Sequence, residues 1–479
     1  MSWYWLLAAL LGAILVLMFV GIPVGIAFLI VCTVTAFLIY GRFGSFDGNL
    51  EAAVFQLTDN AFSNMANFAI VPIPMFLLMG ELFFHTGLAR RMFNAIEQLM
   101  GRVPARLSYV TVGGGTALAT LSGSSMGATA LLGTLMVPEM TARGYKKSMS
   151  IGPILGTGGL AMLIPPSALA VLLGTIAEID IGKLLIAGII PGIVLATLYV
   201  ILIFVRATLD PEAAPAYDME PVSWGERARL LVCDVMPMVS VIIMVIALIM
   251  FGVATPSEAA AYGCLGVIIL AGCYLLLAPL LRAMFGGPGE SRQRALAEVR
   301  AFVPDFAHAF WHSMFGAARV TVVALLILLG SSLFSNVLAA SGASVALIDW
   351  VTSFDVSAYI MLLMMLGILL LLGMFMDQLA MMLLTVPIFF PVVAGLDFGM
   401  ELAVTQIWFG IIMLLAMEVS FTTPPFGLLL FVMQGVAPPG TRFSEICIAA
   451  IPFMACAMLL IALIIMFPGL AVWLPFLLD

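Results

Sequence analysis

The chain has 479 residues, of which 63% are hydrophobic and only 9% are charged, and its mean hydropathy is +1.21. Soluble domains have about 25% charged residues, so this composition predicts a polytopic membrane protein. The formal charge is −8 with only 18 Lys plus Arg, which argues against a nucleic-acid-binding protein because such proteins need a basic surface. The six cysteines lie inside apolar stretches without metal-like spacing, so we expect them to serve packing.

Residues 1–206 are predicted to form a first repeat of membrane segments. A Gly-Ile-Pro break at residues 21–23 interrupts the first apolar stretch, and two spans fit the bilayer thickness better here than one long kinked helix. An arginine-containing amphipathic stretch around residues 90–106 is expected at the membrane interface. The segments predicted in this repeat are spans at about 3–20, 23–40, 68–86 and 184–205, a hairpin at 107–141 and a broken helix at 148–176.

The segment 107–141 is apolar but is flanked by basic residues on both sides. Arg106 precedes it, and Arg143 and Lys146 follow it, so the positive-inside rule places both of its ends in the cytoplasm. Each arm has about 15 residues, fewer than the roughly 20 that a spanning helix needs. We therefore predict a re-entrant hairpin with Ser122–Ser125 at its tip; two ordinary spans with a tight outer turn are the alternative. Counting back through three spans places the N-terminus in the periplasm.

The second half of the chain repeats this order with the opposite orientation. Residues 207–230 are polar and contain prolines, so we interpret them as a cytoplasmic linker. Residues 231–479 then form a second repeat, with a hairpin at about 357–395 and a broken helix at about 402–434. Inverted repeats with interrupted helices are typical of secondary transporters.

Each broken helix is interrupted by a proline pair, Pro165-Pro166 in the first repeat and Pro424-Pro425 in the second. Proline has no N–H and blocks the helical bond to the carbonyl four residues back, so we expect free carbonyl groups, including those of Ala161 and Ser420. Such carbonyls suit Na⁺, while the N-termini of the following half-helices suit an anion such as a carboxylate. A proline kink without a binding function is the alternative for either pair alone.

Asp377 and Glu418 are ionisable residues in apolar surroundings, which makes both of them functional candidates. The alternative for Asp377 is a helix N-cap, and the alternative for Glu418 is a structural cap or pair. The sequence contains no nucleophile–base constellation, phosphate-binding loop or metal signature. We therefore predict that the protein is not an enzyme.

A set of residues spread over essentially the whole chain resembles a known family. The set comprises Ser122-Gly123-Ser124-Ser125, Pro138, Met140, Gly144-Tyr145, Ile164-Pro165-Pro166-Ser167, Thr255-Pro256-Ser257-Glu258-Ala259-Ala260, Gly373, Asp377, Phe409-Gly410, Glu418, Thr423-Pro424-Pro425 and Gly427. The family is the large membrane subunit of the TRAP (tripartite ATP-independent periplasmic, DctM-like) transporters. The chain departs from it at Ala161, where members usually have Gly, and at Ser420 and Thr422, where members often have Gly and an aliphatic residue.

The resemblance implies an all-α polytopic membrane protein of the ion-transporter superfamily, with inverted repeats, two re-entrant helical hairpins and two broken helices. It implies a large permease subunit in the bacterial inner membrane that takes up an organic acid anion together with Na⁺ by an elevator mechanism. The implied partners are a periplasmic solute-binding protein (DctP-like) and a small membrane subunit (DctQ-like).

The resemblance also implies roles for individual residues at the hairpins and breaks. The residues implied for solute binding are Ser124, Ser125, Ser167, Ser420 and Thr422. The residues implied for Na⁺ binding are Ser122, Gly123, Ser125, Gly159, Ala161, Ile164, Pro165, Gly373, Asp377, Thr423 and Pro424.

Two other functions stay open at this point. One is a stand-alone carrier or H⁺-coupled antiporter of related architecture, and Na⁺-dependent uptake that requires an added binding protein would exclude it. The other is a membrane enzyme or scaffold that transports nothing, for which a repeat of broken helices has no evident use. The sequence does not name the solute.

Overall fold

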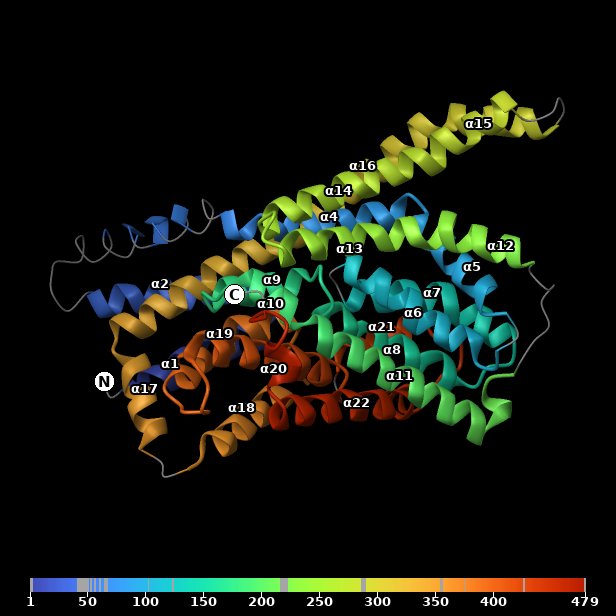
Figure 1. The fold of residues 1–479 in the computed structure, drawn as a ribbon. Coiled ribbons are helices and arrows are strands. Elements are labelled where there is room, and N and C mark those ends of the chain that lie inside the picture. Colours follow the sequence, from blue (N-terminus) through green and yellow to red (C-terminus); the bar gives the residue numbers. More distant parts are fainter. Residues whose placement is uncertain are drawn as a thin grey trace.

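A computed structural model shows that the chain folds into helices (Figure 1). The structure describes residues 3–40, 51, 54–55, 57–59, 62–63, 68–101, 103–122, 125–215, 223–285, 290–353, 356–374, 376–424 and 427–477. These residues contain helices and no strands, which confirms the predicted all-α class. Six of the described helices are long and apolar enough to cross a membrane, or up to eight when each bent pair counts as one span.

The chain begins with two apolar helices, α1 (Trp3–Phe19) and α2 (Val24–Tyr40). Between them Gly21 has a φ of +93°, a conformation that a residue with a Cβ rarely adopts. Helix α2 packs against the 51-residue helix α16 (Glu290–Ala340). A Cβ at Gly25 would lie 2.8 Å from a leucine side chain of α16, so this close contact requires glycine.

Four helices lie side by side along one side of the molecule (Figure 1). They are α4 (Pro72–His85), α13 (Met236–Met250), α14 (Pro256–Gly272) and α16. At a rise of 1.5 Å per residue α16 is about 75 Å long, far more than the roughly 30 Å of a hydrocarbon core. Helix α16 therefore extends beyond the thickness of a bilayer.

The first hairpin consists of α6 (Arg106–Ser122) and α7 (Ser125–Ala142). It is preceded by the amphipathic helix α5 (Leu88–Met100), which bends by 65° from α4. Glu97 of α5 lies 3.2 Å from Arg106, at the start of α6, and 3.2 Å from Arg143, just after α7. Both ends of the hairpin therefore lie at the same end of the molecule.

The second hairpin and the two broken helices complete the centre of the molecule. The second hairpin is α18 (Ala358–Leu372) with α19 (Gln378–Ala394). The first broken helix is α8 (Lys147–Leu163) with α9 (Ala168–Ile176), bent by 46°. The second is α20 (Leu402–Phe421) with α21 (Leu428–Val436). Both halves of the chain thus place a hairpin directly before a broken helix.

The remaining elements connect and flank these helices. They are η1 (Phe68–Ile70), α10 (Ile181–Ala187), α11 (Ile189–Leu209), η2 (Pro211–Ala213), α12 (Trp224–Leu230), the π-helical turns η3 (Leu231–Val235) and η4 (Cys273–Leu277), α15 (Ala278–Phe285), α17 (Ala343–Thr352), α22 (Phe443–Met466) and α23 (Gly469–Val472).

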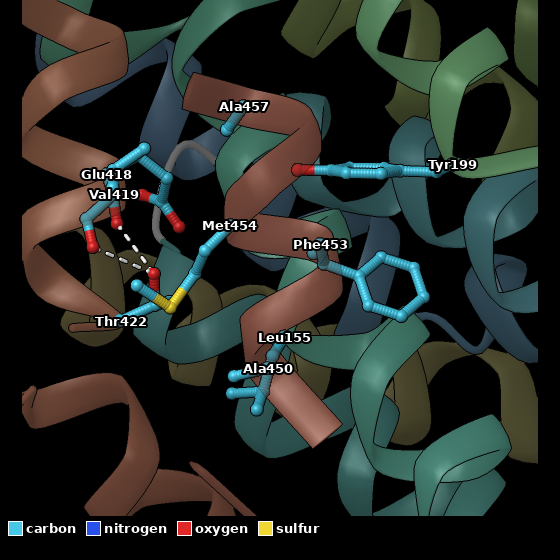
Figure 2. Close-up of a pocket in the computed structure, with 10 residues that line it drawn as sticks. Leu155, Tyr199, Glu418, Val419, Thr422, Ala450, Phe453, Met454 and Ala457 are labelled. Atoms are coloured by element: carbon cyan, nitrogen blue, oxygen red, sulfur yellow. Dashed lines mark hydrogen bonds between the residues drawn. The ribbon is translucent and has the colours of Figure 1, made fainter. Parts of the chain in front are cut away.

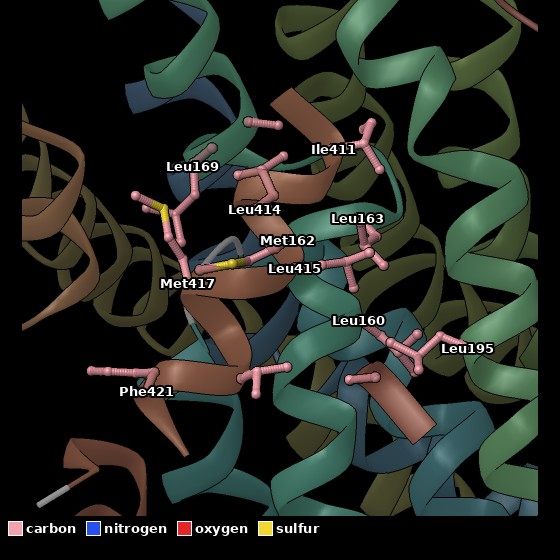
Figure 3. Close-up of a cluster of buried hydrophobic side chains, with 14 of the residues drawn as sticks. Leu160, Met162, Leu163, Leu169, Leu195, Ile411, Leu414, Leu415, Met417 and Phe421 are labelled. Carbon is pink, nitrogen blue, oxygen red and sulfur yellow. The ribbon is translucent and has the colours of Figure 1, made fainter. Parts of the chain in front are cut away.

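Helices α8 and α20 pack against each other through buried aliphatic side chains (Figure 3). Leu160 and Leu163 of α8 and Leu414 and Leu415 of α20 are each at most 1% exposed. In a membrane, helix association depends on close van der Waals packing, because lipid is as apolar as leucine. This packing fixes the two broken helices beside each other, so that their breaks lie in one region.

Candidate functional site

Glu418 lies where the two hairpins and the two broken helices meet. Its side chain extends from α20 and is only 5% exposed. Its Oε2 atom accepts a hydrogen bond of 3.0 Å from Ser125 Oγ, at the start of α7, and one of 2.8 Å from Gln378 Nε2, at the start of α19. One carboxylate oxygen therefore connects the second broken helix to both hairpins.

Helix α8 passes Glu418 at two consecutive glycines. A Cβ at Gly159 would lie 2.8 Å from Glu418 Cγ, so α20 can approach this closely only because residue 159 has no side chain. The carbonyl oxygen of Gly158 lies 3.0 Å from Ser125 Oγ. The single hydroxyl hydrogen of Ser125 serves either this carbonyl or Glu418, one at a time. The first broken helix thereby joins the same junction.

The tip of the first hairpin is only partly described. Gly123 and Ser124 lie outside the described residues, and Ser122 is described only as the last residue of α6. Ala119 of α6, Ala128 of α7 and Ala161 of α8 form a separate cluster of buried residues near the tip. Their small side chains permit the close approach of three helices, and Ala161 is therefore placed beside the hairpin.

The second hairpin contacts α20 through Gly373. A Cβ at this position would lie 1.9 Å from Ser420 Oγ and 2.3 Å from Ser420 Cβ, which no backbone adjustment of a few tenths of an ångström would relieve. Asp377 occupies the N-cap position of α19 with extended backbone angles. The next residue, Gln378, bonds Glu418. The structure thus places Gly373 and Asp377, which were assigned to Na⁺, in the same region as Ser420, which was assigned to the solute.

The hydroxyl groups at the second break point back to their own helix. Ser420 donates to the Met417 carbonyl at 2.7 Å, and Thr422 and Thr423 donate to the Val419 carbonyl at 2.9 and 2.7 Å. Because their hydrogens are used, these oxygens offer only lone pairs, which suit a cation better than an anion. Thr422 and Ser420 would have to release these bonds to donate to an anionic solute.

The prediction of a free carbonyl at Ser420 was wrong. The Thr423 N–H donates to the Ser420 carbonyl oxygen at 3.1 Å. Pro424 does remove the N–H that would have served this carbonyl in a regular helix, but the chain tightens into a turn with bonds between residues three apart. The N–H of the residue before the proline replaces the missing donor.

The first break is capped on both sides. Helix α8 ends at Leu163, and the N–H of Ile164 bonds to the Leu160 carbonyl at 3.1 Å. Pro165 and Pro166 follow, joined by a cis peptide bond. Ser167 is the N-cap of α9, where its Oγ accepts a hydrogen bond of 3.2 Å from a backbone N–H. Ser167 was predicted to bind the solute. In the structure its hydroxyl oxygen caps helix α9.

A pocket lies beside Glu418 between α8, α11, α20 and α22. Figure 2 shows Glu418, Val419 and Thr422 on one side of it, and Tyr199 and Phe453 on the other. Its lining residues are Leu155, Gly156, Tyr199, Glu418, Val419, Thr422, Ala450, Phe453, Met454 and Ala457. The pocket places the carboxylate of the junction next to a small, mostly apolar space.

The sequence did not identify Gln378 or Thr129 as site residues. Gln378 lies beside Asp377 in an otherwise apolar stretch, and this isolation is the signal that could have found it. Thr129 lies in α7, one turn beyond Ser125, and nothing in the sequence distinguishes it from other helix threonines. Its position becomes notable only in the folded chain, where its Oγ1 is buried without a hydrogen-bond partner and would lie 3.2 Å from a Cβ at Gly158 of α8.

Residues 11–470 match the family described as "Tripartite ATP-independent periplasmic transporter, DctM component". The chain is 28% identical to the C4-dicarboxylate TRAP transporter large permease protein DctM of Pseudomonas aeruginosa, over 88% of this chain and 90% of that relative. It is 26% identical to the DctM protein of Vibrio cholerae, over 96% of each chain. It is also 26% identical to the isethionate TRAP transporter permease protein DctMQ of Oleidesulfovibrio alaskensis, of which it spans only 56%.

The fold is similar to that of a solved transporter structure. The Alcanivorax borkumensis YdaH transporter, whose crystal structure was described as having an unusual topology, aligns with a TM-score of 0.51 over 88% of this chain and 89% of that one. The sequence identity is 14%, so this likeness concerns the fold alone. Together with the match over residues 11–470, the hairpins and broken helices show that the chain belongs to the DctM component family of the tripartite ATP-independent periplasmic transporters.

Proposed function

We propose that the protein is the large permease subunit of a Na⁺-coupled secondary transporter. It takes up an organic acid anion that a periplasmic solute-binding protein delivers, and it works by an elevator mechanism. The observation that carries this proposal is the convergence of both hairpins and both broken helices on Glu418. Interrupted helices that meet at one point offer unpaired backbone groups to ions and solutes, which is how secondary transporters build their sites.

Na⁺ coupling is supported by the oxygen atoms that the breaks gather. The positions assigned to Na⁺ include Thr423 and Pro424 at the second break, and Ile164 and Pro165 at the first. The Thr423 hydroxyl donates to its own helix, so its lone pairs remain for a hard cation. Pro165 removes the regular helical donor of the Ala161 carbonyl, four residues back, which leaves an oxygen ligand of the kind that Na⁺ prefers. The Ser420 carbonyl at the second break has the Thr423 N–H as a replacement donor.

An organic acid is supported by the half-helices and by the names of relatives. Helices α9 and α21 begin directly after the breaks, and a helix N-terminus favours negative charge. The relatives are named for C4-dicarboxylate, isethionate, sialic acid and 2,3-diketo-L-gulonate, all of which are acids. The hydroxyls of Ser420 and Thr422, where the family often has Gly and an aliphatic residue, are expected to influence which acid is accepted.

The proposed partners are a DctQ-like small membrane subunit and a DctP-like periplasmic binding protein. The relative named DctMQ is longer than this chain, which spans 56% of it. Its name joins the two membrane components, which supports a separate small subunit for this chain.

The elevator mechanism assigns a moving part and a fixed frame. We assign the hairpins and broken helices to the moving part, and α4, α13, α14 and α16 to the frame. The two parts touch where a Cβ at Gly330 of α16 would lie 3.6 Å from Leu383 Cδ1 of α19. Cross-linking cysteines at positions 330 and 383 with Hg²⁺ should stop uptake, and thiol should restore it. Full uptake by the cross-linked protein would contradict the elevator assignment.

Reconstituted uptake tests the proposed function. The chain and its small subunit are placed in proteoliposomes, and the binding protein is added with its radiolabelled acid. Uptake should require an inward Na⁺ gradient and the binding protein, and a K⁺ gradient should not replace Na⁺. Uptake driven by a pH gradient without the binding protein would instead favour a stand-alone H⁺-coupled carrier. No solute movement with all components present would refute the transporter proposal.

A further inference from the structure

Two buried side-chain oxygens at the junction have no hydrogen-bond partner, Glu418 Oε1 and Thr129 Oγ1. Glu418 Oε2 accepts two hydrogen bonds, whereas Oε1 of the same carboxylate accepts none. Thr129 also differs from its neighbour in α7, since Thr134 donates to the carbonyl four residues back at 2.7 Å. Buried polar oxygens in folded proteins nearly always have a hydrogen-bond partner or bind an ion or a water molecule. We therefore expect each of these two oxygens to bind such a partner.

Both oxygens face the same position of α8. A Cβ at Gly158 would lie 3.2 Å from Thr129 Oγ1, 3.3 Å from Glu418 Oε1 and 3.2 Å from Leu429 Cδ2. Because residue 158 has no side chain, the two oxygens and the Cδ2 methyl group of Leu429, in α21, can all approach its backbone. Helices α7 and α8 from the first half of the chain and α20 and α21 from the second half each contribute to this contact.

The charge balance at this position favours a cation. The two groups that bond Glu418, the Ser125 hydroxyl and the Gln378 amide, are both neutral. Among the described residues no ion pair includes Glu418. A buried carboxylate without a positive partner is strongly disfavoured, so the group either takes up a proton or binds a cation. A single carboxylate with a hydroxyl suits a monovalent ion, since divalent Ca²⁺ sites gather several carboxylates.

We infer that Thr129 Oγ1 and Glu418 Oε1 are ligands of a monovalent cation bound over Gly158, between the two halves of the chain. The cation is Na⁺ if the proposed function holds, and the inference rests on that proposal. Neither Thr129 nor Glu418 was among the residues assigned to Na⁺ from the sequence. The site adds a side-chain carboxylate to the carbonyl and hydroxyl oxygens at the helix breaks.

Equilibrium binding of ²²Na⁺ to the purified two-subunit complex tests this inference. Thr129→Val keeps the side-chain shape and removes the hydroxyl, and it should weaken Na⁺ binding by about 10-fold, the scale of losing a metal-site group. Glu418→Gln should weaken it at least as much. Thr134→Val is the matched control in the same helix, where the hydroxyl is exposed and bonds its own backbone, and it should bind Na⁺ like the wild type.

A variant that adds a methyl group at the site gives a second test, which can be read even if the Glu418→Gln variant does not fold. Gly158→Ala would place a methyl group 3.2 Å from Thr129 Oγ1 and 3.3 Å from Glu418 Oε1 and should also weaken Na⁺ binding. Gly113→Ala, where a Cβ would meet nothing within 4 Å, is its control. Wild-type Na⁺ affinity in both Thr129→Val and Gly158→Ala would overturn the inference while leaving Na⁺-driven uptake intact. A wild-type complex that neither binds nor uses Na⁺ would refute the proposed function as well.

Discussion

Gly373 and Ser420 show how closely the second hairpin approaches the second broken helix. A Cβ at Gly373 would overlap the Ser420 side chain, at 1.9 Å from Oγ and 2.3 Å from Cβ, while the next nearest atom is a backbone carbon at 3.2 Å. Gly373→Ala should therefore reduce the free energy of unfolding by about 1–3 kcal/mol, as overpacked cores do, and should reduce uptake.

A second substitution, at Ser420, should restore the stability that Gly373→Ala loses. Adding Ser420→Gly removes the two overlapping atoms, so the double variant should regain most of the lost stability in thermal unfolding of the purified complex. If Gly373→Ala is as stable as the wild type, or if the double variant is no better than Gly373→Ala, then this close contact does not exist as described.

At the residue scale the sequence identified Glu418 and Ser125 as candidates but not the contact between them, and it did not identify Gln378. Glu418 was identified because an ionisable residue in an apolar stretch is rare. Its hydrogen bonds reach Ser125, 293 positions away, and Gln378, 40 positions away. Such pairs depend on how helices pack, and a single sequence carries no signal for that. The two unpartnered oxygens near Gly158 could not be predicted from the sequence either, because they come together only when the helices pack.

At the scale of the elements, the proline pairs predicted where helices end. Helix α8 ends at Leu163 and α20 at Phe421, just before each pair, because proline cannot continue the helical hydrogen-bond pattern. The sequence overestimated the number of free carbonyls, since Thr423 bonds Ser420. A proline shows which donor is missing, but not whether a neighbouring N–H turns to replace it.

Replacing Pro165-Pro166 with Ala-Ala should let α8 continue into α9 and remove the 46° bend. The carbonyls before the break would regain helical donors, so we expect uptake to fall and the Na⁺ concentration for half-maximal uptake to rise. Uptake in proteoliposomes at a series of Na⁺ concentrations measures both. Pro304→Ala is the control, because Pro304 is exposed and lies within the unbroken helix α16. An unchanged Na⁺ titration in the Ala-Ala variant would argue against a role for this break.

For the whole molecule, the sequence predicted the order of segments and the kind of fold, because apolar runs, proline breaks and basic flanks are local features. The side-by-side packing of α8 with α20 (Figure 3), which brings the breaks together, joins segments from different halves. The shared contacts of Arg106 and Arg143 with Glu97 agree with a hairpin whose two ends lie on one side. Which side that is remains a prediction.

Cysteine labelling tests the orientation of the molecule. In a variant without the six native cysteines, Lys146→Cys at the start of α8 should react with a membrane-impermeant maleimide only from the cytoplasm, because the positive-inside rule places this basic end there. Ser357→Cys, at the start of α18, should react only from the periplasm. Periplasmic labelling of position 146 would reverse the predicted topology, including the periplasmic N-terminus.

The central claim is that the junction of hairpins and broken helices around Glu418 couples Na⁺ to transport. The most direct test is the Na⁺ dependence of uptake by Ser125→Ala, which loses the hydroxyl shared by Glu418 and the Gly158 carbonyl. Ser240→Ala, which loses only a bond to its own helix in α13, is the control. We predict that Ser125→Ala lowers uptake and raises the half-saturating Na⁺ concentration, while Ser240→Ala behaves as the wild type. Wild-type uptake and Na⁺ dependence in Ser125→Ala would contradict the account.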